Sequence, residues 1–347
     1  MKRIPRDPEK FEVIDMVSAI GRKTSFKIGD EASEAAVLGK VSDSYRRARK
    51  NPALLHGRRT EDMFGYVAAS LRSCVLVKEE DAGEAYVTSS TIRIPDYRLV
   101  TNDGYEFLVE VKNFHQSNPS APFSLDSSYV DGLLQYAALL KKDLKFAVYW
   151  SRWNLWTLVS ADKLKGVGSE RELTITEALQ VSEMSSLLGD LHLGTTPPLV
   201  LRLRADTTKP RAVEPSSSQV IFTIGAVEFY CAGRLIVDDL EKSLAFYLIL
   251  YGDWVESESK ADVKDGELVS IDFESRPRES EPKQEFEIIG SLSSMASGKY
   301  NDLTLSEGGV ERLSPDAEPD SLVLHVPHGY RGKDLPLWRL KVEPPQK

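Results

Sequence analysis

Residues 95–112 read PDYRLVTNDGYEFLVEVK, with two runs of β-forming residues on either side of the turn sequence TNDG at 101–104. A three-residue hairpin loop with glycine in the left-handed position is a common connection between such strands. In that register Asp96 lies directly opposite Glu110. The segment therefore predicts a β-hairpin that brings two carboxylates together.

The pattern of side chains in this hairpin favours that register. Because side chains alternate along a strand, Lys112 joins Asp96 and Glu110 on one face. The opposite face is apolar and consists of Tyr97, Leu99, Phe107, Val109 and Val111. A two-residue Asp-Gly turn would place Asp96 across from Val111 and would mix charge with core on both strands. The apolar face therefore favours the three-residue loop.

The charged face suits a metal-assisted reaction. Two carboxylates on neighbouring strands form a hard-oxygen site for Mg²⁺ or Mn²⁺, which keep bound water and can also hold a phosphate oxygen. The ammonium of Lys112 could contact the attacking water or a non-bridging phosphate oxygen and stabilise developing charge. These residue types predict hydrolysis of a phosphodiester.

The surrounding pattern predicts a mixed α/β fold. Helices are expected at 31–50, at 61–73 with Thr60 as N-cap, at 129–142 and at 174–188. Strands are expected at 85–94, 96–100, 105–111, 146–150 and 155–159, and Gly65 should permit close approach of its helix to a sheet. Beyond residue 219, strands are expected at 220–229, 268–273, 286–289 and 322–326, with a helix at 240–251.

These residues resemble a known motif. Pro95-Asp96, a gap of thirteen residues and then Glu110-Val111-Lys112 resemble the PD-(D/E)XK motif of the restriction-endonuclease-like nuclease superfamily. The resemblance covers roughly residues 55–165. It implies a restriction-endonuclease-like mixed sheet flanked by helices, with Asp96, Glu110 and the Val111 carbonyl as metal ligands and Lys112 positioning water or phosphate.

Two further residues enter through the same resemblance. Glu61, four residues before Gly65, stands where the family's preceding helix often contributes a glutamate, so it resembles a further metal or water ligand. Gln135 resembles a glutamine of RecB-like members and is assigned to nucleic-acid binding. Leu139 stands where those members have an accompanying tyrosine, so the sequence departs from the family pattern at this position.

The implied function is a Mg²⁺- or Mn²⁺-dependent nuclease, with DNA favoured over RNA as substrate. Endonuclease and exonuclease action both stay open, and restriction, repair and phage defence are all compatible with this layout. One alternative is a catalytically inactive binding or scaffold protein that has kept the nuclease fold. Another is an exposed hairpin face with solvated charges.

Charge is distributed unevenly along the 347 residues. Residues 1–205 hold 28 Lys and Arg against 27 Asp and Glu, a net +1, whereas residues 206–347 hold 16 against 26, a net −10. The Pro- and Ser-containing segment 207–219 lies at the break and is predicted to be a linker. The domains expected are a helical extension (1–54), the nuclease-like domain (55–206) and an acidic α+β accessory domain (220–347).

The two parts should have different partners. The densest basic stretch is 45–59, in which Arg58 and Arg59 are candidates for contact with nucleic acid, although a solvated helix face explains the cluster equally well. The acidic part should turn away from nucleic acid and could form a homodimer or grip a basic protein partner.

The remaining signals are structural. Cys74 and Cys231 lie too far apart in the sequence to suggest a disulfide framework or a cysteine metal site. The absence of a long apolar run or leader predicts a cytoplasmic protein without membrane contact. His115, His325 and His328 are expected to be surface or loop residues, and Trp150, Trp153 and Trp156 to be core or rim.

Overall fold

The computed structural model describes residues 1–3, 13–22, 30–81, 85–87, 91–213, 220–255, 259–277, 285–307 and 309–345. Its helices include α1 (Val13–Arg22), α2 (Glu31–Ala48), α3 (Pro52–Ser70), α4 (Ser127–Leu140), α5 (Ile175–Val181), α6 (Met184–Leu188), α7 (Asp239–Tyr251) and α8 (Leu292–Thr304). None of the helices in these ranges is both long and apolar enough to cross a bilayer.

The strands of the N-terminal half are β1 (Cys74–Glu79), β2 (Tyr97–Thr101), β3 (Glu106–Phe114), β4 (Phe123–Asp126), β5 (Asp143–Trp150), β6 (Leu155–Ser160), β7 (Lys165–Val167), β8 (Glu170–Leu173), β9 (His192–Thr195) and β10 (Leu199–Ala205). Those of the C-terminal half are β11 (Ile224–Cys231), β12 (Arg234–Leu235), β13 (Lys260–Lys264), β14 (Glu267–Ser275), β15 (Glu287–Ser291), β16 (Leu305–Ser306), β17 (Gly309–Val310) and β18 (Leu337–Leu340).

The first sheet has the order β1-β2-β3-β5-β6. Strands β1, β2 and β3 are antiparallel neighbours, β3 and β5 run parallel, and β5 and β6 form an antiparallel hairpin. A parallel pair needs a crossover, which α4 supplies between β3 and β5. The prediction of a mixed α/β sheet flanked by helices is therefore confirmed.

Helices cover both faces of the first sheet. One face packs against α3, α6 and α8 through a core that includes Met63, Phe64, Leu188 and Tyr300. The other packs against α4 and α5 through Val130, Leu133, Ile175 and Ala178. Gly65 allows α3 to approach closely, because a Cβ at this position would lie 2.8 Å from the Tyr97 hydroxyl oxygen.

Two predictions around α3 are wrong. The helix begins at Pro52, where the side chain of Asn51 accepts from the Leu54 N–H at 3.2 Å, and it continues through Thr60. Thr60 is therefore buried mid-helix, donating to the His56 carbonyl at 2.7 Å instead of capping. The strand expected at 85–94 is also absent from 85–87 and 91–94, and residues 88–90 lie outside the described ranges. Strand β1 takes the place beside β2, and β3 occupies the other side.

The C-terminal part contains a second sheet of order β12-β11-β10-β14-β13 and a small sheet of order β15-β9-β18. The predicted helix 240–251 corresponds to α7, and the strand runs 220–229, 268–273 and 286–289 correspond to β11, β14 and β15. The strand predicted at 322–326 is wrong, because these residues are irregular. The helix predicted at 174–188 is split into α5 and α6.

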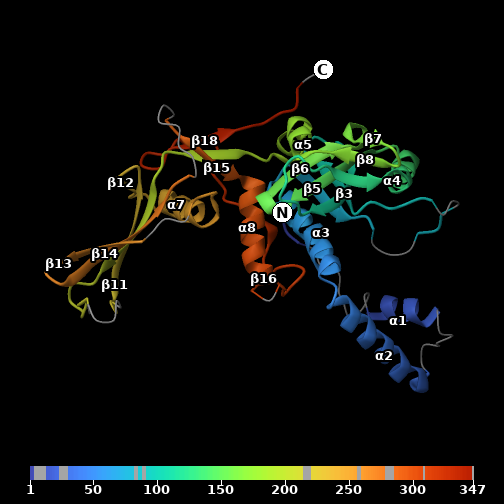
Figure 1. The fold of residues 1–347 in the computed structure, drawn as a ribbon, viewed down its shortest axis with the longest axis horizontal. Helices are drawn as coiled ribbons and strands as arrows, with labels where there is room; N and C mark the ends of the chain where they lie inside the picture. The colour runs from blue at the N-terminus through green and yellow to red at the C-terminus, as the bar shows by residue number, and fades with distance from the viewer. Residues whose placement is uncertain are drawn as a thin grey trace.

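Strand pairing changes the expected division of the chain. Residues 207–213 follow β10 and precede β11, which is its antiparallel neighbour in the second sheet, so the predicted linker connects two strands of one sheet. Residues 214–219 lie outside the described ranges. Conversely, α8 stands between the two parts in Figure 1, and its Ala296 and Tyr300 belong to the core of the first sheet. The unit built around the first sheet thus includes a helix from the C-terminal part of the sequence.

At the other end, α1 and α2 project away from both sheets and join the body through α3 (Figure 1). The side chains of Arg46, Arg47, Arg49 and Lys50 are exposed near the end of α2. The basic stretch predicted at 45–59 therefore lies where α2 is followed by α3. The projecting part, α1 and α2, is called the arm below.

Candidate active site

The central hairpin has the predicted register. Tyr97 pairs with Val109 and Leu99 with Phe107. The loop closes through a hydrogen bond from the Thr101 N–H to the Tyr105 carbonyl at 2.9 Å, and Gly104 has φ +88°, which favours glycine. The apolar face is buried in the core beneath α3, as predicted.

Asp96 lies one residue before β2, so the register brings it opposite Glu110. Its Oδ2 accepts a hydrogen bond from the Val111 N–H at 2.7 Å, which ties the carboxylate to β3. Glu110 is only 2% exposed on the face covered by α4. The two carboxylates are therefore held on adjacent strands in partly or fully buried positions.

Lys112 and Tyr129 complete this group. The Lys112 ammonium donates to Glu110 Oε1 and, at 3.2 Å, to the Tyr129 hydroxyl, while that hydroxyl also donates to Glu110. Burial is the largest single effect and disfavours the charged ammonium, but Glu110, Tyr129 and Asp96 together outweigh it and raise the pKa of Lys112. Burial and then Glu110 raise the pKa of Tyr129 to about 12, so the phenol stays a hydrogen-bond donor.

Asp96, unlike Glu110, forms no ion pair with any residue that the structure describes. Burial first and the Glu110 charge second raise its pKa to about 7, against opposing effects of the Val111 N–H and Lys112. Glu61 contributes in the same direction as Glu110. A buried and a partly buried carboxylate of like charge are costly to keep close together, and a divalent cation would relieve that cost.

Glu61 projects from α3 toward the same place. It lines a small pocket together with Asp96 and Tyr97, and the Tyr97 hydroxyl donates to the Glu61 backbone carbonyl at 3.1 Å. The Glu61 carboxylate forms an ion pair with Arg58 at 2.7 Å. The structure thus brings Glu61 to the same pocket as Asp96, the position that the resemblance implied for it.

Three acidic residues at this pocket were missed by the sequence reasoning: Asp62, Glu79 and Asp81. Burial and then Glu79 raise the pKa of Asp62 to about 6. Glu79 and Asp81 could not be predicted from the local sequence, because they lie at and just after the end of β1, a strand that the sequence analysis did not predict. Tyr129 was missed as well, since it resembles an ordinary helical apolar position.

The donors at this pocket suit Mg²⁺ or Mn²⁺, because carboxylate oxygens are the ligands that these ions prefer. Across the described ranges, however, no three His, Cys, Asp or Glu side chains are grouped closely enough to hold a metal ion as they stand. Glu110 is engaged by Lys112 and Tyr129, so a bound ion would require it to reorient toward Asp96. Val111 lies on β3 with its side chain buried and its N–H on Asp96.

The three residues predicted to contact nucleic acid differ in their exposure to solvent. Arg58 has an exposed side chain (54%) next to Glu61. Gln135 is exposed on α4, where its Oε1 accepts from Thr91 at 2.8 Å. Arg59 is a correction: it is 3% exposed and donates to Thr304 and Asn301 of α8. It faces the interior because adjacent helical positions point in different directions, and it cannot contact nucleic acid there.

The other sequence expectations have plain outcomes. Trp150 and Trp156 are buried, whereas Trp153 is 38% exposed. His115 is exposed beside Ser151. Cys74 and Cys231 are free and buried.

The raised pKa of Asp96 predicts a pH-dependent stability in the presence of a chelator. Between about pH 4 and pH 7 the folded protein binds a proton that the unfolded chain lacks, so the free energy of unfolding should fall as pH rises through this window. Asp96→Asn removes the charge and keeps an acceptor for the Val111 N–H. The variant should be more stable than wild type by about 2–4 kcal/mol at pH 8 and nearly equal at pH 4.

This is measured by urea unfolding at pH 4, 6 and 8 in EDTA. Asp162→Asn is the matched control, because Asp162 is 67% exposed and contacts only its neighbour Lys163 among the interactions of the described residues. A difference between Asp96→Asn and wild type that does not change with pH would contradict the assignment.

Comparison with known proteins adds little. No family model and no curated protein matches the sequence. Among solved structures, the chain is similar to Hjc, a Holliday junction resolvase of the archaeon Archaeoglobus fulgidus, with 16% identity and a TM-score of 0.23 over 29% of this chain and 76% of that one. At this level the likeness supports no assignment of function.

Proposed function

We propose that this protein is a metal-dependent nuclease that hydrolyses phosphodiester bonds, with DNA favoured over RNA. The observation that carries the proposal is the cross-strand placement of Asp96 and Glu110, with Lys112 hydrogen-bonded to Glu110 on the same face. Buried carboxylates beside a lysine are costly to maintain for structure alone. Such a group on a rigid hairpin is well placed for chemistry.

In this proposal Asp96, Glu110 and Glu61 hold Mg²⁺ or Mn²⁺, and the Val111 carbonyl is a further ligand. The ion would supply a water of lowered pKa and polarise the phosphate. Lys112 would then lose its hydrogen bond with Glu110 and donate instead to the attacking water or to a phosphate oxygen. Tyr129 positions Lys112 and Glu110 relative to each other.

The approach of nucleic acid is assigned to the side of α3 and α2. Arg58 lies one helical turn before Glu61, and the exposed Arg46, Arg47, Arg49 and Lys50 continue this charge along the arm. At 1.5 Å per residue, Pro52 lies roughly 14 Å from Glu61 along α3. The arm would therefore contact the backbone a few phosphates away from the bond that is cut. Gln135, exposed on α4, would contact nucleic acid from the other side of the hairpin's charged group.

The test is a cleavage assay with wild-type protein on supercoiled plasmid, single-stranded DNA and RNA, each with Mg²⁺, Mn²⁺ or EDTA. Metal-dependent cutting would support the proposal, and comparison of the three would rank the substrates. Calorimetric titration with Mn²⁺ measures the metal site independently of the substrate, and millimolar or tighter affinity is expected.

No cleavage and no Mn²⁺ binding would contradict the proposal and favour a binding or scaffold protein of this fold. A protein partner or homodimer through the acidic part, a cytoplasmic location and a role in restriction, repair or phage defence stay predictions. The cleavage assay addresses none of these three.

A further inference from the structure

A second pocket lies where the two parts of the molecule meet. Its volume is about 450 Å³, which is within the range of small-molecule sites. One side is formed by the end of α3 and the residues after it, from Ser70 to Arg72, and the other by β9, β18 and residues 323–328. Junctions between folding units are common places for ligand sites.

The charge of this pocket is opposite to that of the chain. Arg72, Arg339, His325 and His328 all line it, and none of the residues that line it is Asp or Glu. The chain as a whole carries a net charge of −9. Just outside this lining, Asp320 pairs with Arg72, while the basic groups of Arg339 and His328 are left without an acidic partner in the described residues. Unpaired basic side chains in the lining of a pocket point to an anionic ligand.

Two of these side chains have no partner in the part of the chain that the structure describes. Neither the Arg339 guanidinium nor the His328 imidazole forms a hydrogen bond or ion pair there, and both residues are exposed. Their donors are therefore available to a ligand. Their exposure means that a ligand could reach them without any rearrangement of the fold.

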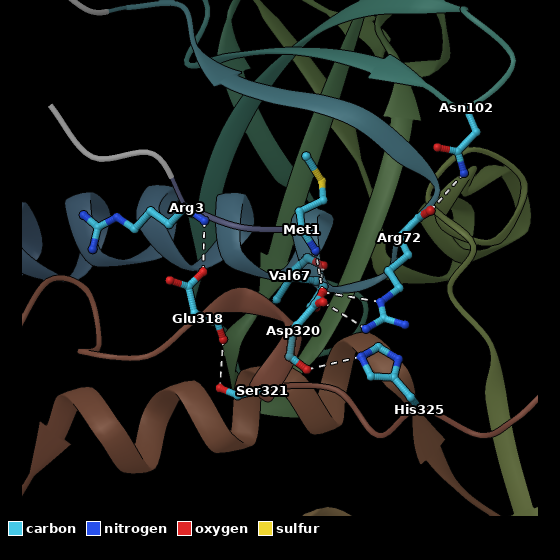
Figure 2. A network of polar contacts seen from close by, with 10 residues as sticks. Met1, Arg3, Val67, Arg72, Asn102, Glu318, Asp320, Ser321 and His325 are labelled. Atoms are coloured by element: carbon cyan, nitrogen blue, oxygen red, sulfur yellow. Dashed lines mark hydrogen bonds and ion pairs between the residues drawn. The ribbon is translucent and has the colours of Figure 1, made fainter.

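Arg72 is held in place instead. Figure 2 shows its guanidinium against Asp320, with Nη2 at 2.9 Å from Oδ2, and the imidazole of His325 close to the same residue, with Nε2 at 3.2 Å from the Asp320 carbonyl. The backbone of Arg72 has φ +62°, and Asn102 donates to its carbonyl at 2.9 Å. A non-glycine residue fixed in this conformation is often part of a functional site.

The rest of the pocket is apolar. Leu71, Leu193, Leu292, Leu324, Val326 and Pro327 contribute to its lining. The combination of arginine donors and aliphatic surface suits a molecule with an anionic head and an apolar or planar body. Because Nε and Nη2 of Arg72 contact Asp320 and Nε2 of His325 contacts the Asp320 carbonyl, the groups left to a ligand are Nη1 of Arg72, the Arg339 guanidinium and the His328 imidazole. Donors from three side chains suit the three oxygens that a phosphate monoester presents better than the two of a carboxylate.

We propose that this pocket binds a nucleoside phosphate, either a free nucleotide or the phosphorylated end of a strand. The phosphate lies between Arg72 and Arg339, and the base packs on the leucines. This site is separate from the hairpin carboxylates and does not depend on the proposed nuclease activity. The helix α3 carries Glu61 and ends at Ser70, which lines this pocket. A bound ligand would therefore contact the helix that also contributes to the candidate active site.

The experiment is calorimetric titration of the full-length protein in EDTA, which prevents metal-dependent cleavage. The probes are dAMP, deoxyadenosine, and a hexathymidylate with or without a 5′-phosphate. We expect dAMP or the phosphorylated oligonucleotide to bind with Kd of about 1 mM or tighter, and its unphosphorylated counterpart at least about 10-fold more weakly. Tighter binding of dAMP identifies a free nucleotide, and tighter binding of the oligonucleotide identifies a strand end.

Arg339→Ala should weaken binding of the phosphorylated probe at least about 10-fold, because it removes one arginine–phosphate contact. Arg331→Ala is the matched control, an exposed arginine of the same C-terminal segment that does not line the pocket, and should bind as wild type does. Val326→Trp fills the pocket and should abolish binding, while thermal unfolding verifies that each variant is folded. Equal affinity for phosphorylated and unphosphorylated probes, wild-type affinity in Arg339→Ala, or no binding of any probe would overturn the proposal.

Discussion

The Lys112→Ala variant should cut nucleic acid at least about 100-fold more slowly than wild type while binding Mn²⁺ at least as tightly. The slower cleavage follows from loss of the ammonium that contacts water or phosphate. The retained affinity follows from the ion pair with Glu110, since removal of Lys112 frees that carboxylate from a competing cation. The measurements are initial cleavage rates on the best substrate and Mn²⁺ titration of the protein alone.

Asp96→Ala should behave differently and lose both Mn²⁺ binding and cleavage. Lys163→Ala and Asp162→Ala serve as matched controls, because these residues form a surface ion pair at 3.2 Å away from the hairpin. Both control variants should cut at the wild-type rate. If Lys112→Ala and Asp96→Ala also cut at that rate, any cleavage would come from another site or from a contaminating enzyme.

Arg59→Ala should lower the free energy of unfolding by about 2–4 kcal/mol, whereas Arg58→Ala should change it by less than about 0.5 kcal/mol. Arg59 is buried between α3 and α8, where Nε donates to Thr304 Oγ1 at 2.8 Å and the guanidinium lies 5.2 Å from the Tyr300 ring centroid. Truncation leaves a cavity and two acceptors without a donor. Arg58 instead forms an exposed ion pair within one helix.

Urea unfolding measures the free energy of unfolding of both variants, which differ from each other only in which of two adjacent helical residues is truncated. Arg59→Met should recover part of the lost stability, because it fills most of the volume without restoring the hydrogen bonds. Nucleic-acid affinity of the folded protein should be lowered by Arg58→Ala and unchanged by Arg59→Met. An Arg59→Ala variant as stable as wild type would show that the contact between α3 and α8 contributes little.

The hairpin could be predicted because its information is local. The turn residues select the loop, the loop selects the register, and the apolar alternation of Tyr97, Leu99, Phe107 and Val109 decides which face is buried. The helices at 31–50 and 129–142 were equally accessible, since they show a local period or a breaker such as Asn51-Pro52. The Thr60 cap failed because a stronger start signal lay nine residues earlier.

The residues around the hairpin depended on contacts between distant segments. Strand β1 was unrecognised because its place beside β2 is a matter of sheet order, and its arrival brings Glu79 and Asp81 to Asp96. The same holds for β10, which pairs with β11 across the predicted linker.

The chain's own pattern was thus enough to predict the charged hairpin and its register, because strand alternation and turn geometry act over a few residues. Packing between residues far apart in the chain determined the rest: Tyr129 on Lys112, Arg59 on α8, and Arg72 beside Arg339 around one pocket. No local period records such contacts, since each is created only when separate elements are brought together to bury their apolar faces.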